Sequence, residues 1–260
     1  MSFSKSSRHV RSVSLPGTTS SHPLLANLHT HIAAIRAWIK DTAAAGSPLP
    51  AGLAAIHALH AALADLLLLP ESRRATMSAS DRLLHAFLLL ADAHQRFQEC
   101  LMSLRHAAAE SHAALRRGDA TTTLASAARS QRRAEKVLAR LAASISSVSS
   151  KCARPNLVGE DAEMVGAMVE AVTVSAAASA AVFSAAASMS SPASSSKKMA
   201  MFIPKFATRK ATAPETAEVA MERLHMLERR FGECDDACNS VFRSVVQARV
   251  SLLNIMTPTI

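Results

Sequence analysis

The 260-residue sequence contains no Tyr, and aromatic residues make up only 3% of it. Glycine is also sparse, with 7 residues in the chain. Strands favour aromatic and β-branched residues, and phosphate-binding loops and nucleophile elbows need several glycines at fixed spacing. The sequence therefore argues against a β-rich fold and against the common nucleotide-binding and hydrolase motifs.

Cysteine is limited to four residues, Cys100, Cys152, Cys234 and Cys238. They are too few and too scattered for the disulfide framework of a secreted protein. Residues 1–23 have no apolar run of the kind found in a secretory signal. We therefore expect an intracellular, cytoplasmic protein with reduced thiols. The Ser-rich, basic and acid-free start is also typical of an organellar transit peptide, which is the alternative.

What the chain has in abundance is helix-forming residues, with 49% apolar residues and a formal net charge of +9. The clearest apolar stripe lies near the C-terminus, at alternating steps of mostly four and three residues: Leu227, Phe231, Cys234, Cys238, Val241, Val245 and Leu252. This spacing predicts one long helix over residues 215–256, about 60 Å in length. We expect the rest of the chain to cover its apolar face.

Similar stripes predict helices over about 23–45, 48–69, 80–117, 121–148 and 160–189. Pro70 and Gly118 mark helix ends, and the Ser80 hydroxyl is placed to cap the third of these helices. The predicted fold class is all-α, an elongated bundle of about five to six long helices. Residues 1–22 are predicted to be a disordered, basic Ser- and Arg-rich segment. Residues 23–256 are predicted to form a single helical-bundle domain with a basic linker at 190–214.

Residues 171–189 carry no charge, so a membrane span must be considered. Ala and Ser dominate this stretch, whereas a span needs about 20 predominantly apolar residues. A buried helix, closely packed through small side chains, is the favoured interpretation.

Several stretches resemble one plant family. They are His9 to Pro16, His22 to Leu25, Leu66 to Pro70, Leu83 to Arg117, and the closing run from Phe242 to Ile255. They are similar to the plant-specific domain-of-unknown-function 241 proteins, which are related to the BYPASS-like (BPS1-type) proteins. The resemblance implies a helical protein, from a family with no established enzymatic activity and no assigned catalytic residues. It also implies a link to root and shoot development through a root-derived mobile signal.

No catalytic, cofactor-binding or metal-ligating residue is predicted. Cys234 and Cys238 lie one turn apart, but a structural zinc site needs four ligands, and both residues fall in the apolar stripe. His57 and His60 lack a carboxylate at ligand spacing, and His94 falls in a core stripe, where a hydrogen-bonded interior residue is expected. The sequence therefore favours no cofactor and no enzyme.

Two basic stretches are candidates for binding. The predicted helix 121–148 carries a stripe that is either a solvated face or a contact for an acidic partner or lipid: Arg129, Arg133, Lys136 and Arg140. In residues 197–210, cations alternate with apolar groups. The candidate contacts to an anionic membrane surface or an acidic partner there are Lys197, Lys198, Lys205, Arg209 and Lys210.

The favoured hypothesis is a non-enzymatic plant regulatory or interaction protein that works through protein partners. The alternative is a peripheral membrane-surface protein that binds anionic lipid through residues 197–210. Nucleic acid is disfavoured as a partner because aromatic residues are few and no binding motif is present.

A candidate phosphosite lies in the N-terminal segment, where Arg11, Ser12, Ser14 and Pro16 stand in the order Arg-Ser-x-Ser-x-Pro. Phosphate on Ser14 would add about −1.5 to −2 charge. This order is the one that 14-3-3 proteins hold in an Arg cluster, so a 14-3-3 protein is a candidate partner.

We expect a synthetic peptide covering residues 5–20 to bind a 14-3-3 protein at least about tenfold more tightly when Ser14 is phosphorylated. The reason is that the phosphate oxygens supply the charge-assisted hydrogen bonds on which such binding depends. Fluorescence polarisation of both peptides measures the difference. Equal, weak binding of the two peptides would contradict the prediction.

Overall fold

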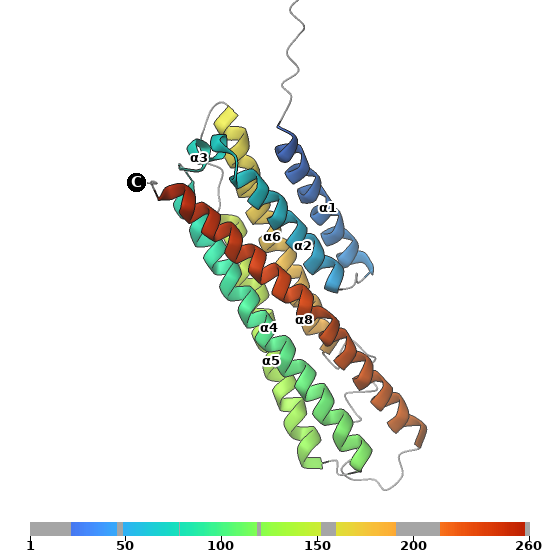
Figure 1. Ribbon diagram of the computed structural model, residues 1–260. Helices are drawn as coiled ribbons and strands as arrows, with labels where there is room; N and C mark the ends of the chain where they lie inside the picture. Colours follow the sequence, from blue (N-terminus) through green and yellow to red (C-terminus); the bar gives the residue numbers. More distant parts are fainter. Residues whose placement is uncertain are drawn as a thin grey trace, which may run out of the picture.

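The computed structural model describes residues 22–45, 49–77, 79–118, 121–151, 160–190 and 214–257. Within these ranges the chain forms seven helices and no strand (Figure 1). The helices are α1 (Pro23–Ala45), α2 (Leu49–Leu67), α3 (Pro70–Met77), α4 (Ser80–Arg117), α5 (Thr121–Lys151), α6 (Glu160–Ser190) and α8 (Pro214–Met256). The predicted all-α fold is confirmed. Six of these helices are long, and the eight-residue α3 was not predicted.

The long helices form an elongated bundle in which α6 is the inner helix. It packs against α1, α2, α3, α4 and α5, whereas α8 packs against α2, α3 and α4. Figure 1 shows α4, α5 and α8 continuing past the end of α6 toward the lower end of the bundle. The expectation that the rest of the chain covers the apolar face of α8 is confirmed, and the helix with the most neighbours is the Ala- and Ser-rich α6.

Small side chains allow α6 to be enclosed by so many neighbours. Its fully buried residues include Ala171, Ala176, Ala178 and Ala186, together with Ser175 and Ser179. Small residues let helix backbones approach closely, and the larger Val172 and Phe183 fill the remaining space. The low content of large aliphatic residues in α6, which argued against a membrane span, therefore also allows the helix to pack among its neighbours.

Two described helices are long and apolar enough to cross a membrane by length and composition alone, Leu49–Leu67 and Ala162–Met189. In the second of these, 67% of the apolar window is buried inside the bundle. This is the behaviour of a core helix, as favoured for residues 171–189.

The apolar stripe of α8 faces the core as predicted. Phe231, Cys234, Cys238, Val241 and Val245 are at most 3% exposed. Leu252 is fully buried as well, and Leu227, at the start of the stripe, is partly buried against the same core. The exposed Arg129, Arg133, Lys136 and Arg140 likewise lie on the outer face of α5, opposite its buried stripe.

The local signals at helix ends were partly right. Gly118 follows α4 with a left-handed backbone, at a φ of 68°, and its N–H donates to the Leu115 carbonyl, as predicted for a helix stop. The predicted Ser80 cap is wrong, because Ala79 is the N-cap residue and the Ser80 hydroxyl donates to the Met77 carbonyl instead. α2 ends at Leu67, before Pro70. Pro70 is instead the first residue of α3, a helix position that suits proline.

Gly52 of α2 is needed for the packing of α1. A Cβ atom at position 52 would lie 2.3 Å from Cζ2 of Trp38, the one Trp in the chain. Gly166 of α6 differs, because a Cβ atom there would meet nothing within 4 Å. Gly166 therefore serves as the matched control for a substitution of Gly52.

We expect Gly52→Ala to destabilise the protein by about 1–3 kcal/mol, since the indole ring must move out of its site. Gly166→Ala should instead stabilise it by about 0.5–1 kcal/mol through helix propensity. Urea unfolding followed by circular dichroism and Trp38 fluorescence measures both changes. If Gly52→Ala proved as stable as Gly166→Ala, the contact between α1 and α2 would be different from the one described.

Candidate functional site

Two histidines are buried in the core, and each forms a hydrogen bond with a serine of α6. His60 of α2 is 0% exposed, and its Nε2 lies 2.8 Å from the Ser175 Oγ. His94 of α4 is 1% exposed, and its Nε2 lies 2.9 Å from the Ser179 Oγ. The two serines are one turn apart, so α6 is joined to α2 and to α4 at adjacent turns.

A third serine extends this network to α8. The Ser244 hydroxyl donates to the Val241 carbonyl at 2.8 Å, so its oxygen is the acceptor in a longer contact of 3.4 Å from Nδ1–H of His60. His60 then carries its proton on Nδ1, and Nε2 accepts the hydrogen bond from Ser175. Phe87 packs edge-on against the His60 ring, with 5.9 Å between ring centroids.

Burial sets the protonation of these groups. It lowers the pKa of His60 from 6.5 to about 3, with smaller contributions from the charges of His94 and His57. Burial also lowers the pKa of His94 to about 4. In the same way it raises the pKa of the Cys234 thiol to about 11, with the Glu233 charge adding to the effect. Burial raises the pKa of Cys238 as well, so both cysteines are protonated core residues, as predicted.

These buried groups hold helices together, and solvent does not reach them. His94 is the hydrogen-bonded interior residue that its position in the α4 stripe predicts. Among the described residues, no group of three or more His, Cys, Asp or Glu side chains is placed to hold a metal ion.

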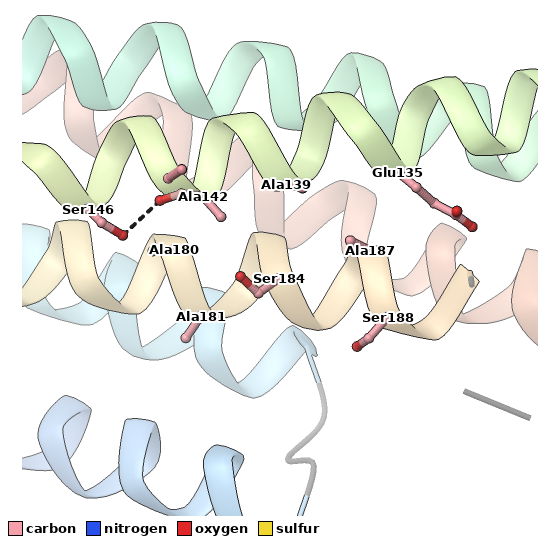
Figure 2. Close-up of a pocket in the computed structure, with 10 residues that line it drawn as sticks. Glu135, Ala139, Ala142, Ser146, Ala180, Ala181, Ser184, Ala187 and Ser188 are labelled. Carbon is pink, nitrogen blue, oxygen red and sulfur yellow. Dashed lines mark hydrogen bonds between the residues drawn. The ribbon is translucent and has the colours of Figure 1, made fainter. Parts of the chain in front are cut away.

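A groove lies between α5 and α6 and is here called the α5–α6 groove. Its volume is about 890 Å³, and it is lined by Glu135, Ala139, Ala142, Ala143, Ser146, Ala180, Ala181, Ser184, Ala187 and Ser188. Figure 2 shows the two helices side by side, with small side chains from both along the groove. The dashed line in Figure 2 is the hydrogen bond from the Ser146 hydroxyl to the Ala142 carbonyl, 2.8 Å long, which stays within α5.

A row of cations runs along α5 next to this groove, here called the basic edge. It consists of Arg129, Arg132, Arg133, Lys136 and Arg140, all of them exposed. Glu135 is the one acid of α5, and it accepts a hydrogen bond from the Gln131 side chain at 3.0 Å. The groove thus has cations next to its α5 side, a single acid in its lining, and an uncharged side on α6.

Two smaller hollows lie where α8 begins. One of about 450 Å³ separates the end of α6 from Arg223, Met226, Leu227 and Arg230. The other, of about 380 Å³, lies between α4 and α8. His112 and His225 line this hollow, and the centroids of their rings are 6.1 Å apart.

The site residues predicted from the N-terminal segment and the linker lie outside the described residues. They are Arg11, Ser12, Ser14 and Pro16, and Lys197, Lys198, Lys205, Arg209 and Lys210. The phosphosite and the membrane contacts therefore remain predictions. The predicted stripe on α5 is described, and the structure adds Arg132 to it.

Residues 52–255 match the family described as Protein BPS1. The chain belongs to the BPS1 family. The match begins in α2 and ends in the last turn of α8, so it includes the His–Ser pairs and the α5–α6 groove. The resemblance to BYPASS-related proteins is thereby confirmed. No curated protein and no solved structure matches the chain.

Sequence reasoning on this BPS1-family chain missed the burial of His60. The signal was present, because His60 follows the buried Ile56 by four residues and precedes Leu63 by three. Ser175 and Ser179 also stand four residues apart on the stripe that carries Val172 and Phe183. A polar residue at a core position requires a buried partner, and here each histidine has a serine.

The histidines make the stability of this BPS1-family protein depend on pH. Their pKa values in the fold lie below the unfolded value of about 6.5, so the folded state binds fewer protons. Stability from the neutral rings is fully present above pH 6.5 and is lost as the pH falls toward the folded values. Each histidine contributes a loss of about 1.4 kcal/mol per pH unit in that window.

We expect His94→Gln to lower this slope by about 1.4 kcal/mol per pH unit, since Gln can bond to Ser179 but does not titrate. Urea unfolding between pH 7 and pH 4.5 gives the slope for each protein. The exposed His29 supplies the control, and His29→Gln should leave the slope of the wild type unchanged. An identical slope in His94→Gln and wild type would show that His94 is not held neutral.

Proposed function

We propose that this BPS1-family member is a non-enzymatic plant regulatory protein that acts by binding protein partners along the α5–α6 groove. The observation that carries the proposal is the groove itself, a hollow of about 890 Å³ lined almost wholly by Ala and Ser. The resemblance links such a role to root and shoot development.

The shape and lining of the groove support binding of a helix. Ala139, Ala143, Ala181 and Ser184 project only one or two heavy atoms, so a third helix can approach both α5 and α6 closely. Side chains of an incoming helix form ridges that pack into such a groove. Helix-in-groove binding is a recurrent mode of protein recognition.

The burial of four reactive side chains argues against a catalytic role for them. His60, His94, Cys234 and Cys238 are at most 1% exposed, so none of them can touch a substrate in solution. Catalysis requires a group within hydrogen-bond reach of the reacting atoms. The groove offers Glu135 and hydroxyl groups, and no histidine or cysteine lines it.

Binding of anionic lipid through residues 197–210 is the second candidate function. It rests on the sequence, in which Lys197, Lys198 and Lys205 surround Met and Phe side chains. A protein with this function would sediment with anionic vesicles.

The groove can be filled without disturbing the core. Ala143 of α5 and Ser184 of α6 both line the groove and are exposed, so Ala143→Trp with Ser184→Trp should leave the protein folded. Ala34 of α1 is exposed on another surface, and Ala34→Trp is the matched control. Circular dichroism checks that all three proteins melt alike.

We expect proteins captured from plant tissue by the wild type to be lost with the double Trp variant and kept with Ala34→Trp. Two indole rings would occupy the space that a partner helix needs. Affinity purification with quantitative mass spectrometry measures the captured set. Capture of the same proteins at the same abundance by all three forms would overturn the groove as the binding site.

A further inference from the structure

We infer that the basic edge makes the α5–α6 groove selective for an amphipathic helix with an acidic side. This inference rests on the proposed function and names the chemistry of the partner. The observation that carries it is a row of five exposed cations on α5. None of them forms an ion pair with another described residue.

The cations are placed to meet whatever enters the groove. Arg129 and Arg140 are eleven residues apart, so the basic edge extends for about 16 Å along α5. Ala139 follows Lys136 by three residues, and Ala143 follows Arg140 by three, so these groove residues are surface neighbours of the cations. A helix lying in the groove would have one side against the basic edge.

The opposite side of the groove carries no charge. α6 contributes only Ala and Ser, and residues 171–190 contain no Asp, Glu, Lys or Arg. Glu135 is the single acid in the lining, and Gln131 already donates to it. The complementary ligand is therefore negative along one side and small and apolar along the other.

Protein is favoured over lipid because the groove is hollow. Binding to a bilayer needs large apolar side chains that project outward. Among the described side chains of α5, Val137 is the one large apolar group that is exposed, at 38%. Four of the five cations are Arg, whose planar fork binds carboxylates with two hydrogen bonds. Carboxylates in a row on a helix suit this surface.

The probe is a synthetic peptide helix built from Glu-Ala-Ala-Glu-Leu-Ala-Ala heptads and about 20 residues long. Its Glu residues form one stripe, and its Ala and Leu residues form the neighbouring stripe. The matched peptide has Gln in place of every Glu. Vesicles of phosphatidylcholine with about one third phosphatidylserine serve as the lipid probe.

Three variants of the full chain separate the contributions. Arg133→Glu, Lys136→Glu and Arg140→Glu together reverse the basic edge. Arg73→Glu, Arg74→Glu and Arg117→Glu reverse three exposed cations elsewhere and change the net charge equally. The third variant is Ala143→Trp with Ser184→Trp, which fills the groove.

We expect the Glu peptide to bind the wild type at least about tenfold more tightly than the Gln peptide, by fluorescence anisotropy. Reversal of the basic edge should remove the binding, and reversal of the control cations should keep it. Filling the groove should weaken it by at least about tenfold. Raising the salt from about 50 to about 300 mM should weaken binding of the Glu peptide more than that of the Gln peptide.

The contrary outcomes are distinct. Equal binding of the two peptides, sensitive to groove filling, would overturn the acidic preference and leave the groove as a binding site. Binding that is unaffected by groove filling would overturn the proposed function together with the inference. Sedimentation with the vesicles, lost on reversal of the basic edge, in the absence of Glu-peptide binding would identify the edge as a lipid surface and overturn the inference.

Discussion

The hydrogen bonds from His60 to Ser175 and from His94 to Ser179 constrain how the bundle can pack. An imidazole or hydroxyl buried without a partner costs a few kcal/mol, a large fraction of the stability of a domain. The three helices α2, α4 and α6 must therefore meet in the one register that brings each histidine to its serine. Ser244 gives α8 a place in the same network. Apolar packing alone would allow neighbouring registers at smaller cost.

The small residues of α6 have two consequences. On its buried faces, Ala171, Ala176 and Ala178 allow five helices to pack around it. On the face beside α5, Ala181 and Ser184 leave a hollow that no other described helix fills. α5 lies at the outside of the bundle, so its cations remain in water, where charge is least costly. The enclosed centre and the open groove therefore both result from the small Ala and Ser side chains of α6.

The inward faces of the helices could be predicted from the sequence because each is a matter of local spacing. Phe231, Cys234, Val241 and Val245 are all buried, and His94 is a bonded interior residue. The wrong or missing predictions concern features that depend on neighbouring helices. Ser80 does not cap α4 because the short α3 leads the chain directly into the first turn. The α5–α6 groove could not be predicted, because it depends on which two helices lie side by side.

The sequence by itself determined the positions of the six long helices, the sides of each helix that avoid water, and membership of the BPS1 family. These depend on periodicity and on chain-breaking residues, which act over a few positions. Only the tertiary structure decided that α6 is the enclosed helix, which serines lie beside His60, and where the groove opens. His60 and Ser175 are 115 positions apart in the chain, and His60 and Ser244 are 184 apart. Several pairings of amphipathic helices bury similar apolar area, and contacts between such distant residues select one of them.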